Sequence, residues 1–213
     1  VIATSGPGAT NLVTGIAAAY MDSSPVVAIT GNVKTSLLGS DSFQEVDIAG
    51  VTMPVTKYSF IASCERGVAQ DVREAFSIAQ SGRKGPVLVD IPADIAAQSE
   101  EYERAPKSEP ARAKEPEEAQ LARAAQMIAK AKRPLIYVGG GAISSGASEA
   151  LGAFAKKLQI PVACSMMGLG AYPCSAKLFL GLVGMHGNPA ANTAALNCDL
   201  LIAAGARFSN RVA

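Results

Sequence analysis

Short, almost uninterrupted runs of branched apolar residues constrain the fold of this chain most. Four such runs stand at 25–29, 86–91, 134–138 and 200–204. A run without polar alternation is typical of a strand buried on both faces, as in parallel sheets. Between the runs, apolar residues recur at helical spacing, for example Leu12, Ile16 and Ala19. Strands that alternate with helices predict an α/β fold with parallel sheets and right-handed crossovers.

A change in composition divides the chain into two parts. Residues 100–118 contain Pro106, Pro110 and Pro116 among mixed charges and almost no large apolar side chain. Such a composition is typical of an extended, solvated linker. We therefore predict two α/β units, residues 1–98 and residues 117–213, joined by a linker over residues 99–116.

The overall composition disfavours several classes of protein. The formal net charge is +1 and 17% of the residues are charged, so no basic surface for nucleic acid or acidic membranes is expected. The apolar runs are far shorter than the roughly 18 residues of a membrane span. With one histidine, His186, and four cysteines without a C-x-x-C pair, a zinc site and a hydrolase triad are both disfavoured. Reduced thiols and a cytoplasmic location are expected.

The two ends of the sequence lack the features of complete termini. Val1 opens the chain inside an apparent strand, without an initiator methionine or a signal peptide, and no helix follows Arg211. We therefore expect this sequence to be the interior of a longer polypeptide.

A glycine triplet stands where a strand gives way to a helix. Gly139, Gly140 and Gly141 have the position of a backbone nest for phosphate, but also of a tight turn, and the pattern leaves both interpretations open. Ser144 occupies the third glycine position of the dinucleotide fingerprint, and no acidic residue follows about 20 residues later. A standard NAD site is therefore disfavoured.

Three other segments are candidates for binding. The turn at 5–8 lacks the lysine of a Walker loop and favours a structural role. The loop at 184–188 places His186 between two glycines and could press on a planar ligand or lie free at the surface. Arg207 and Arg211 follow the last strand, where arginines bind phosphate or carboxylate or remain solvated.

Taken together, these segments resemble the large subunit of the thiamine-diphosphate-dependent acetolactate synthases (acetohydroxyacid synthases) along essentially the whole chain. The most specific are ATSGPGATNLVTGIA (3–17), SFQE (42–45), SGRKGPVLVDIPADI (81–95), YVGGG (137–141), MMGLGAYP (166–173) and GMHGNPAAN (184–192).

The resemblance implies the later part of a pyrimidine-binding domain in residues 1–98 and the first part of a Rossmann-like central domain in residues 117–213. It implies decarboxylation of pyruvate on thiamine diphosphate, with Mg²⁺, and condensation of the hydroxyethyl group with a second 2-keto acid in branched-chain amino acid biosynthesis. The family's catalytic glutamate and its Mg²⁺ motif would lie outside this sequence. The isolated chain is therefore expected to be inactive, and its parent to be a homo-oligomer that can bind a regulatory small subunit.

The resemblance also assigns roles to individual residues. The family's central domain binds FAD, which takes no net part in redox chemistry. Phe43, Gln44 and Lys57 match positions near the substrate channel, and Arg211 matches a residue near the acceptor carboxylate. Matches to flavin contacts are Arg83, Gly139, Gly140, Gly141, Ser165, Met166, Met167, Met185, His186, Gly187, Gly205, Ala206 and Arg207. No metal ligand is assigned.

Some residues depart from the family pattern and keep alternatives open. Asn210 stands where an aspartate is usual, Ala93 where a channel lysine is common, and Lys34 where a proline is common. The segments 43–48 and 207–211 also resemble glyoxylate carboligase, which joins two glyoxylates. A non-catalytic module that binds FAD or ADP is a third interpretation.

Overall fold

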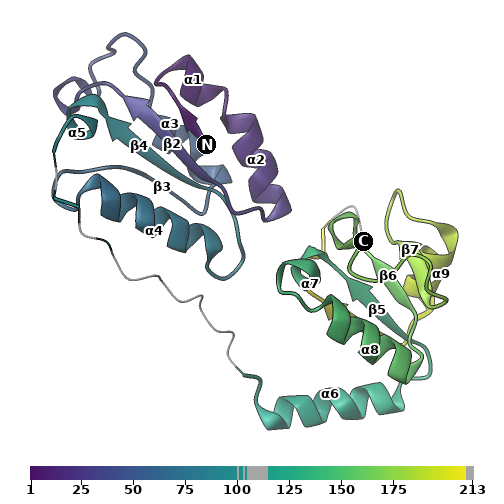
Figure 1. Cartoon of the computed structure of the whole chain (residues 1–213). Coiled ribbons are helices and arrows are strands. Elements are labelled where there is room, and N and C mark those ends of the chain that lie inside the picture. Colours follow the sequence, from purple (N-terminus) through teal and green to yellow (C-terminus); the bar gives the residue numbers. More distant parts are fainter. Residues whose placement is uncertain (100, 103, 105–114, 210–213) are drawn as a thin grey trace. The chain divides into compact units, whose positions relative to one another are not determined.

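The computed structural model describes residues 1–99, 101, 102, 104 and 115–209. The chain divides into two compact units, Val1–Arg112 and Ala113–Ala213, and each is described by itself. Both units are parallel α/β structures, which confirms the predicted fold class (Figure 1).

Unit 1 is built on a four-stranded parallel sheet in the order β1-β2-β4-β3. The strands are β1 (Ile2–Ala3), β2 (Val27–Asn32), β3 (Tyr58–Ile61) and β4 (Val87–Pro92). The helices are α1 (Pro7–Thr10), α2 (Val13–Asp22), α3 (Ile48–Thr52), α4 (Val68–Gln80) and α5 (Ala93–Ala96), with 3₁₀ turns η1 (Thr35–Leu37) and η2 (Met53–Val55).

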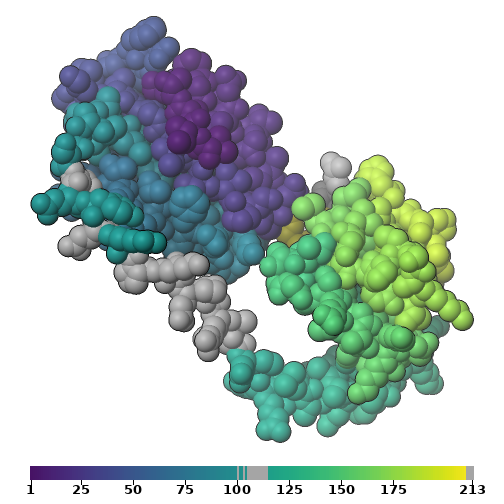
Figure 2. Space-filling model, viewed as in Figure 1, coloured from purple at the N-terminus to yellow at the C-terminus, as the bar shows by residue number. Residues whose placement is uncertain are grey.

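Helices cover both faces of this sheet, which explains the apolar run of β4. Val87 and Val89 pack with residues of α4 on one face, whereas Leu88 packs with Ile16 of α2 and Ile48 of α3 on the other. Successive strand residues point to opposite faces, so a strand covered on both sides needs apolar residues at consecutive positions. Figure 2 shows one face of each unit in space-filling form, with unit 1 in purple to teal and unit 2 in green to yellow.

Unit 2 repeats this architecture with the strand order β7-β6-β5-β8. The strands are β5 (Pro134–Val138), β6 (Val162–Cys164), β7 (Phe179–Leu182) and β8 (Leu200–Ala204). The helices are α6 (Glu118–Lys130), α7 (Gly140–Ser144), α8 (Ser148–Leu158) and α9 (Pro189–Asn197), with the 3₁₀ turn η3 (Met166–Gly168).

The core of unit 2 also lies on two faces of its sheet. Leu151 of α8 packs with Ile136 and Val162 on one face, and Ala191 of α9 packs with Leu135 on the other. The order places β5, the first strand, between β6 and β8. The chain therefore reverses its direction across the sheet after β7, and ligands of open parallel sheets gather at such switch points.

Two strands were not predicted from the sequence. β3 and β7 are edge strands without fully buried residues, so neither shows a continuous apolar run. β7 also contains Gly181 at φ 97° beside a register shift at Val162 and Ala163. No helix among the described residues has both the length and the apolar character needed to cross a membrane.

Candidate functional site

Phe43 and Gln44 lie on the long loop that follows β2, at the carboxyl edge of the unit 1 sheet. Phe43 is 88% exposed, and Gln44 has the left-handed backbone φ of 61°. Gly6, after β1, adopts φ 59° and packs on Gln44: a Cβ at Gly6 would lie 2.9 Å from the Gln44 Cβ. The turn at 5–8 therefore supports the loop that presents the two predicted substrate residues.

Two carboxylates hold this loop in shape. Glu45 accepts hydrogen bonds from the backbone N–H groups of Gly39 and Ser42, the latter at 2.9 Å. These bonds lower the pKa of Glu45, because they stabilise its charged form. Asp94 accepts from the Thr35 backbone N–H at 2.9 Å and from its hydroxyl, and so attaches the start of the loop to α5.

A buried acid, Asp90, joins the two central strands beneath the loop. It accepts hydrogen bonds from Thr30 Oγ1 at 2.7 Å and from Asn32 Nδ2, and Asn32 also contacts the Val46 carbonyl at 3.4 Å. Burial raises the pKa of Asp90, the two hydrogen bonds oppose that rise, and the charge of Asp47 adds to it. Sequence analysis missed Asp90, although a single acid inside an apolar run was a usable signal.

Lys57 lies at the opposite, amino edge of the same sheet. Its backbone N–H donates to the Pro86 carbonyl at 2.8 Å, just before β3 and β4. Its Nζ donates to the carbonyls of Ile78 and Ser81, at the end of α4. Burial lowers the pKa of Lys57. Within unit 1 the structure thus does not bring Lys57 together with Gln44.

Arg83, predicted as a flavin contact, also lies in unit 1 and closes the end of α2. Its Nε donates to Ser23 Oγ at 2.8 Å and its terminal nitrogen to the Tyr20 carbonyl at 3.0 Å. The guanidinium stands 5.5 Å from the centre of the Tyr20 ring. The favourable placement of a cation at a helix C-terminus accounts for this position.

The other predicted cofactor residues all come together at the carboxyl edge of the unit 2 sheet. They form the loops that follow β5 (139–141), β6 (165–167), β7 (185–187) and β8 (205–207). The strand order therefore assembles four distant segments around the end of β5. Arg211 and Asn210 lie outside the described residues.

The glycines of the β5 loop pack against the backbone of the β8 loop. A Cβ at Gly139 would lie 2.4 Å from the Gly205 carbonyl oxygen, and one at Gly141 would lie 2.7 Å from it. The Gly141 N–H donates to that carbonyl at 2.9 Å. Contact between the two loops therefore requires these glycines, independently of any ligand.

The remaining loop residues leave apolar and cationic side chains accessible. Met166, Met167 and Met185 are 63%, 48% and 73% exposed, and Arg207 is also exposed. Exposed methionines provide polarizable contacts for a planar ring, and arginine binds phosphate through two parallel hydrogen bonds. These side chains are therefore accessible to a ligand at this edge of the sheet.

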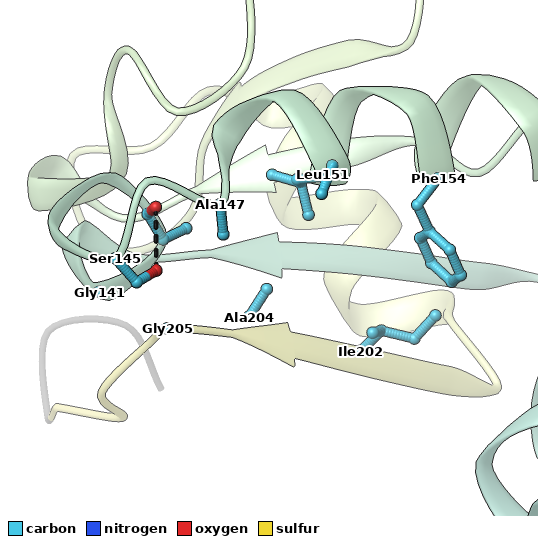
Figure 3. Close-up of a pocket in the computed structure, with 10 residues that line it drawn as sticks. Gly141, Ser145, Ala147, Leu151, Phe154, Ile202, Ala204 and Gly205 are labelled. Atoms are coloured by element: carbon cyan, nitrogen blue, oxygen red, sulfur yellow. Dashed lines mark hydrogen bonds between the residues drawn. The ribbon is translucent and has the colours of Figure 1, made fainter. Parts of the chain in front are cut away.

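An apolar groove begins beside these loops and runs along one face of the sheet. Its volume is about 400 Å³, between α8 and β8. Leu151 and Phe154 extend from α8 toward Ile202 of β8 (Figure 3). Gly141 and Gly205 line the end of the groove next to the loops.

No cluster of three or more His, Cys, Asp or Glu side chains suited to a metal occurs in the described parts of the chain.

Comparison with known families agrees with this two-unit organisation. Residues 1–51 match the thiamine pyrophosphate enzyme N-terminal TPP binding domain, and residues 121–213 match the thiamine pyrophosphate enzyme central domain.

Similar proteins cover almost the entire chain. A probable acetolactate synthase large subunit of Methanocaldococcus jannaschii is 48% identical over 99% of this chain and 37% of its own length. The isozyme 3 large subunit of Escherichia coli is 45% identical over 99% of this chain and 38% of its own length. The acetolactate synthase large subunit of Corynebacterium glutamicum is 49% identical over 99% of this chain and 34% of its own length.

This chain thus spans little more than a third of the length of the relatives it matches. The two domain matches follow each other in the chain order of the two structural units, and the similarity continues across both. The chain belongs to the thiamine pyrophosphate enzymes, within which it corresponds to N-terminal and central domain sequence similar to that of acetolactate synthase large subunits.

Proposed function

We propose that this chain is part of a cytoplasmic acetolactate synthase catalytic subunit, a transferase that forms carbon–carbon bonds between 2-keto acids. The observation that supports this proposal most is the 45–49% identity to such subunits over 99% of the chain. Thiamine diphosphate, when bound with Mg²⁺, supplies the chemistry that decarboxylates pyruvate and joins its two-carbon unit to an acceptor.

Unit 1 contributes the loop at the carboxyl edge of its sheet to this reaction. Phe43, as an exposed aromatic, shields the reacting groups from water, and the Gln44 amide orients the 2-keto acid by hydrogen bonding. The left-handed backbone of Gln44 supports a functional role, because such strain is concentrated at binding sites. In this proposal Arg211 binds the carboxylate of the acceptor keto acid. Lys57, at the other edge of the unit 1 sheet, attracts the negatively charged 2-keto acid.

Unit 2 binds FAD through the four loops at the carboxyl edge of its sheet. The methionines at 166, 167 and 185 pack on the flavin ring together with His186, and Arg207 binds the diphosphate. Arg83 contributes a further contact. The flavin stabilises the assembled subunit, whereas substrate contacts belong to unit 1. We further propose a homo-oligomer that can bind a regulatory small subunit, and an isolated 213-residue chain without turnover.

The test uses the full-length parent protein with thiamine diphosphate, Mg²⁺ and FAD. Product is measured from pyruvate and, separately, from glyoxylate. Acetolactate from pyruvate supports the proposal, and tartronate semialdehyde from glyoxylate alone would identify a glyoxylate carboligase instead. Binding of FAD or ADP without either product would identify a non-catalytic module. Turnover of pyruvate by the isolated chain would refute its proposed inactivity.

A further inference from the structure

Tyr137, in β5, has a buried hydroxyl group without a hydrogen-bond partner among the described residues. The residue is 2% exposed, and burial raises the pKa of its phenol. A buried, unpaired hydroxyl destabilises the protein, since it has exchanged its bonds with water for none. Phenylalanine would fill the same space without this cost. Packing alone therefore does not explain a tyrosine at this position.

The surroundings of Tyr137 suit its ring. Its neighbours across the sheet are Ala163 of β6 and Ala203 of β8, whose small side chains leave room for an aromatic residue between them. The ring is thus held in place by two strands. Its position is therefore fixed independently of the hydroxyl.

The hydroxyl lies beneath the loops of the candidate cofactor site. Phe208, which follows β8, stands with its ring 5.9 Å from that of Tyr137. The Ser165 side chain, which follows β6, acts on the phenol as a weak hydrogen-bonding neighbour that lowers its pKa and partly offsets burial, but the two groups do not reach the geometry of a full hydrogen bond. Both neighbours thus belong to segments that surround the end of β5.

We propose that Tyr137 donates its buried O–H to an acceptor oxygen of the dinucleotide bound by unit 2. This inference rests on the proposed FAD site. Phe208, whose ring stands beside that of Tyr137, is 65% exposed, and its displacement by the ligand would open a path to the hydroxyl. The binding of the ligand then supplies the hydrogen bond that the free protein lacks.

The experiment compares the full-length parent protein with its Tyr137→Phe variant. The Tyr172→Phe variant is the matched control. Tyr172 is a buried tyrosine of the same unit, 6% exposed, whose ring packs near Phe179. Flavin fluorescence gives the Kd for FAD, calorimetry gives the Kd for ADP, and thermal unfolding is followed with and without FAD. None of these measurements requires turnover.

We expect Tyr137→Phe to weaken FAD binding about tenfold, while the Tm without ligand stays equal or rises. Tyr172→Phe leaves the Kd unchanged. A parallel loss of ADP affinity assigns the bond to the adenosine diphosphate portion, and a loss for FAD alone assigns it to the remainder of the flavin. Both results support the inference.

Two results would overturn the inference while leaving the FAD site intact. The first is wild-type affinity for FAD in Tyr137→Phe. The second is a lower Tm of that variant without ligand, since the hydroxyl would then be bonded in the free protein. If the wild-type full-length protein binds neither FAD nor ADP, the proposed cofactor site and this inference both fail.

Discussion

Gly6 and Gln44 are in direct backbone contact: a Cβ added at Gly6 would lie 2.9 Å from both the Cβ and the carbonyl oxygen of Gln44. Gly6→Ala therefore displaces the loop and also strains a backbone with positive φ. We expect a loss of roughly 1–3 kcal/mol in the free energy of unfolding, measured in urea. Gly15→Ala, at an open position of α2, is the control and stabilises by about 0.5–1 kcal/mol. Equal effects of the two substitutions would contradict the contact.

Thr30 stabilises the ionised form of the buried Asp90. Thr30→Val keeps the shape of the side chain but removes its hydrogen-bond donor, so we expect the free energy of unfolding to fall by about 1–3 kcal/mol. Thr30→Ser keeps the donor and should retain most of the wild-type stability. Removing the donor raises the pKa of Asp90 further, and the carboxyl is charged only at higher pH. The loss is therefore larger at neutral than at acidic pH. Urea unfolding at several pH values tests this, and a loss independent of pH would exclude the carboxyl as the cause.

The loop around Gln44 depends on the charge of Glu45. Its folded pKa lies below the ordinary value, so its contribution is present at neutral pH and disappears as the pH falls below about 4. Glu45→Gln removes this dependence on pH. The protection factors of the Gly39 and Ser42 amides, which correct NMR exchange rates for the intrinsic rate at each pH, should decrease in acid for the wild type. Protection factors that stay the same on acidification would show that the carboxylate does not hold the loop.

Gly139 is required for the approach of the β8 loop. Gly139→Ala places a methyl group 2.4 Å from the Gly205 carbonyl oxygen and should lower the Tm of unit 2 and abolish FAD binding. Gly152→Ala, at an open position of α8, is the control, and we expect it to stabilise by about 0.5–1 kcal/mol. A variant at Gly139 with wild-type Tm but no FAD binding would instead show that only the ligand needs the glycine.

Lys57 donates hydrogen bonds to carbonyls at the end of α4. Removing these bonds tests whether Lys57 has a structural role or a role in substrate binding. Lys57→Met should lower the free energy of unfolding by about 0.5–1.5 kcal/mol, because the carbonyls of Ile78 and Ser81 lose a charged donor. Lys57→Arg keeps a charged donor and should retain part of the stabilisation. In the full-length protein the KM for pyruvate is measured in parallel. A raised KM with unchanged stability would assign Lys57 to the substrate channel.

The fold was predictable where burial on both faces dictated the residue type. The run around Leu88 needs apolar side chains on both sides, and its sequence shows them directly. The edge strands β3 and β7 are half-exposed and have no such requirement, so nothing in their composition distinguished them from loops.

The site was predictable as a set of loops but not as a set of contacts. Gly139 could be either a turn or a ligand nest, because the atom that excludes a side chain belongs to Gly205, far along the chain. Lys57 and Gln44 lie close in sequence, yet they stand at opposite edges of the parallel sheet, and these edges are separated by the length of its strands. The partners of Asp90 depend on the register between β2 and β4, which no local pattern specifies.

The position of β5 between β6 and β8 has a consequence for synthesis of the protein. A growing polypeptide can form β5, β6 and β7 in succession, but the wall of the site formed by residues 205–207 is made last. For the proposed FAD site, the ribosome must therefore release the whole of β8 before all four loops can contact the cofactor. If unit 2 binds FAD as proposed, a chain that stops before β8 binds no flavin, and flavin fluorescence quenching distinguishes it from a chain that contains β8.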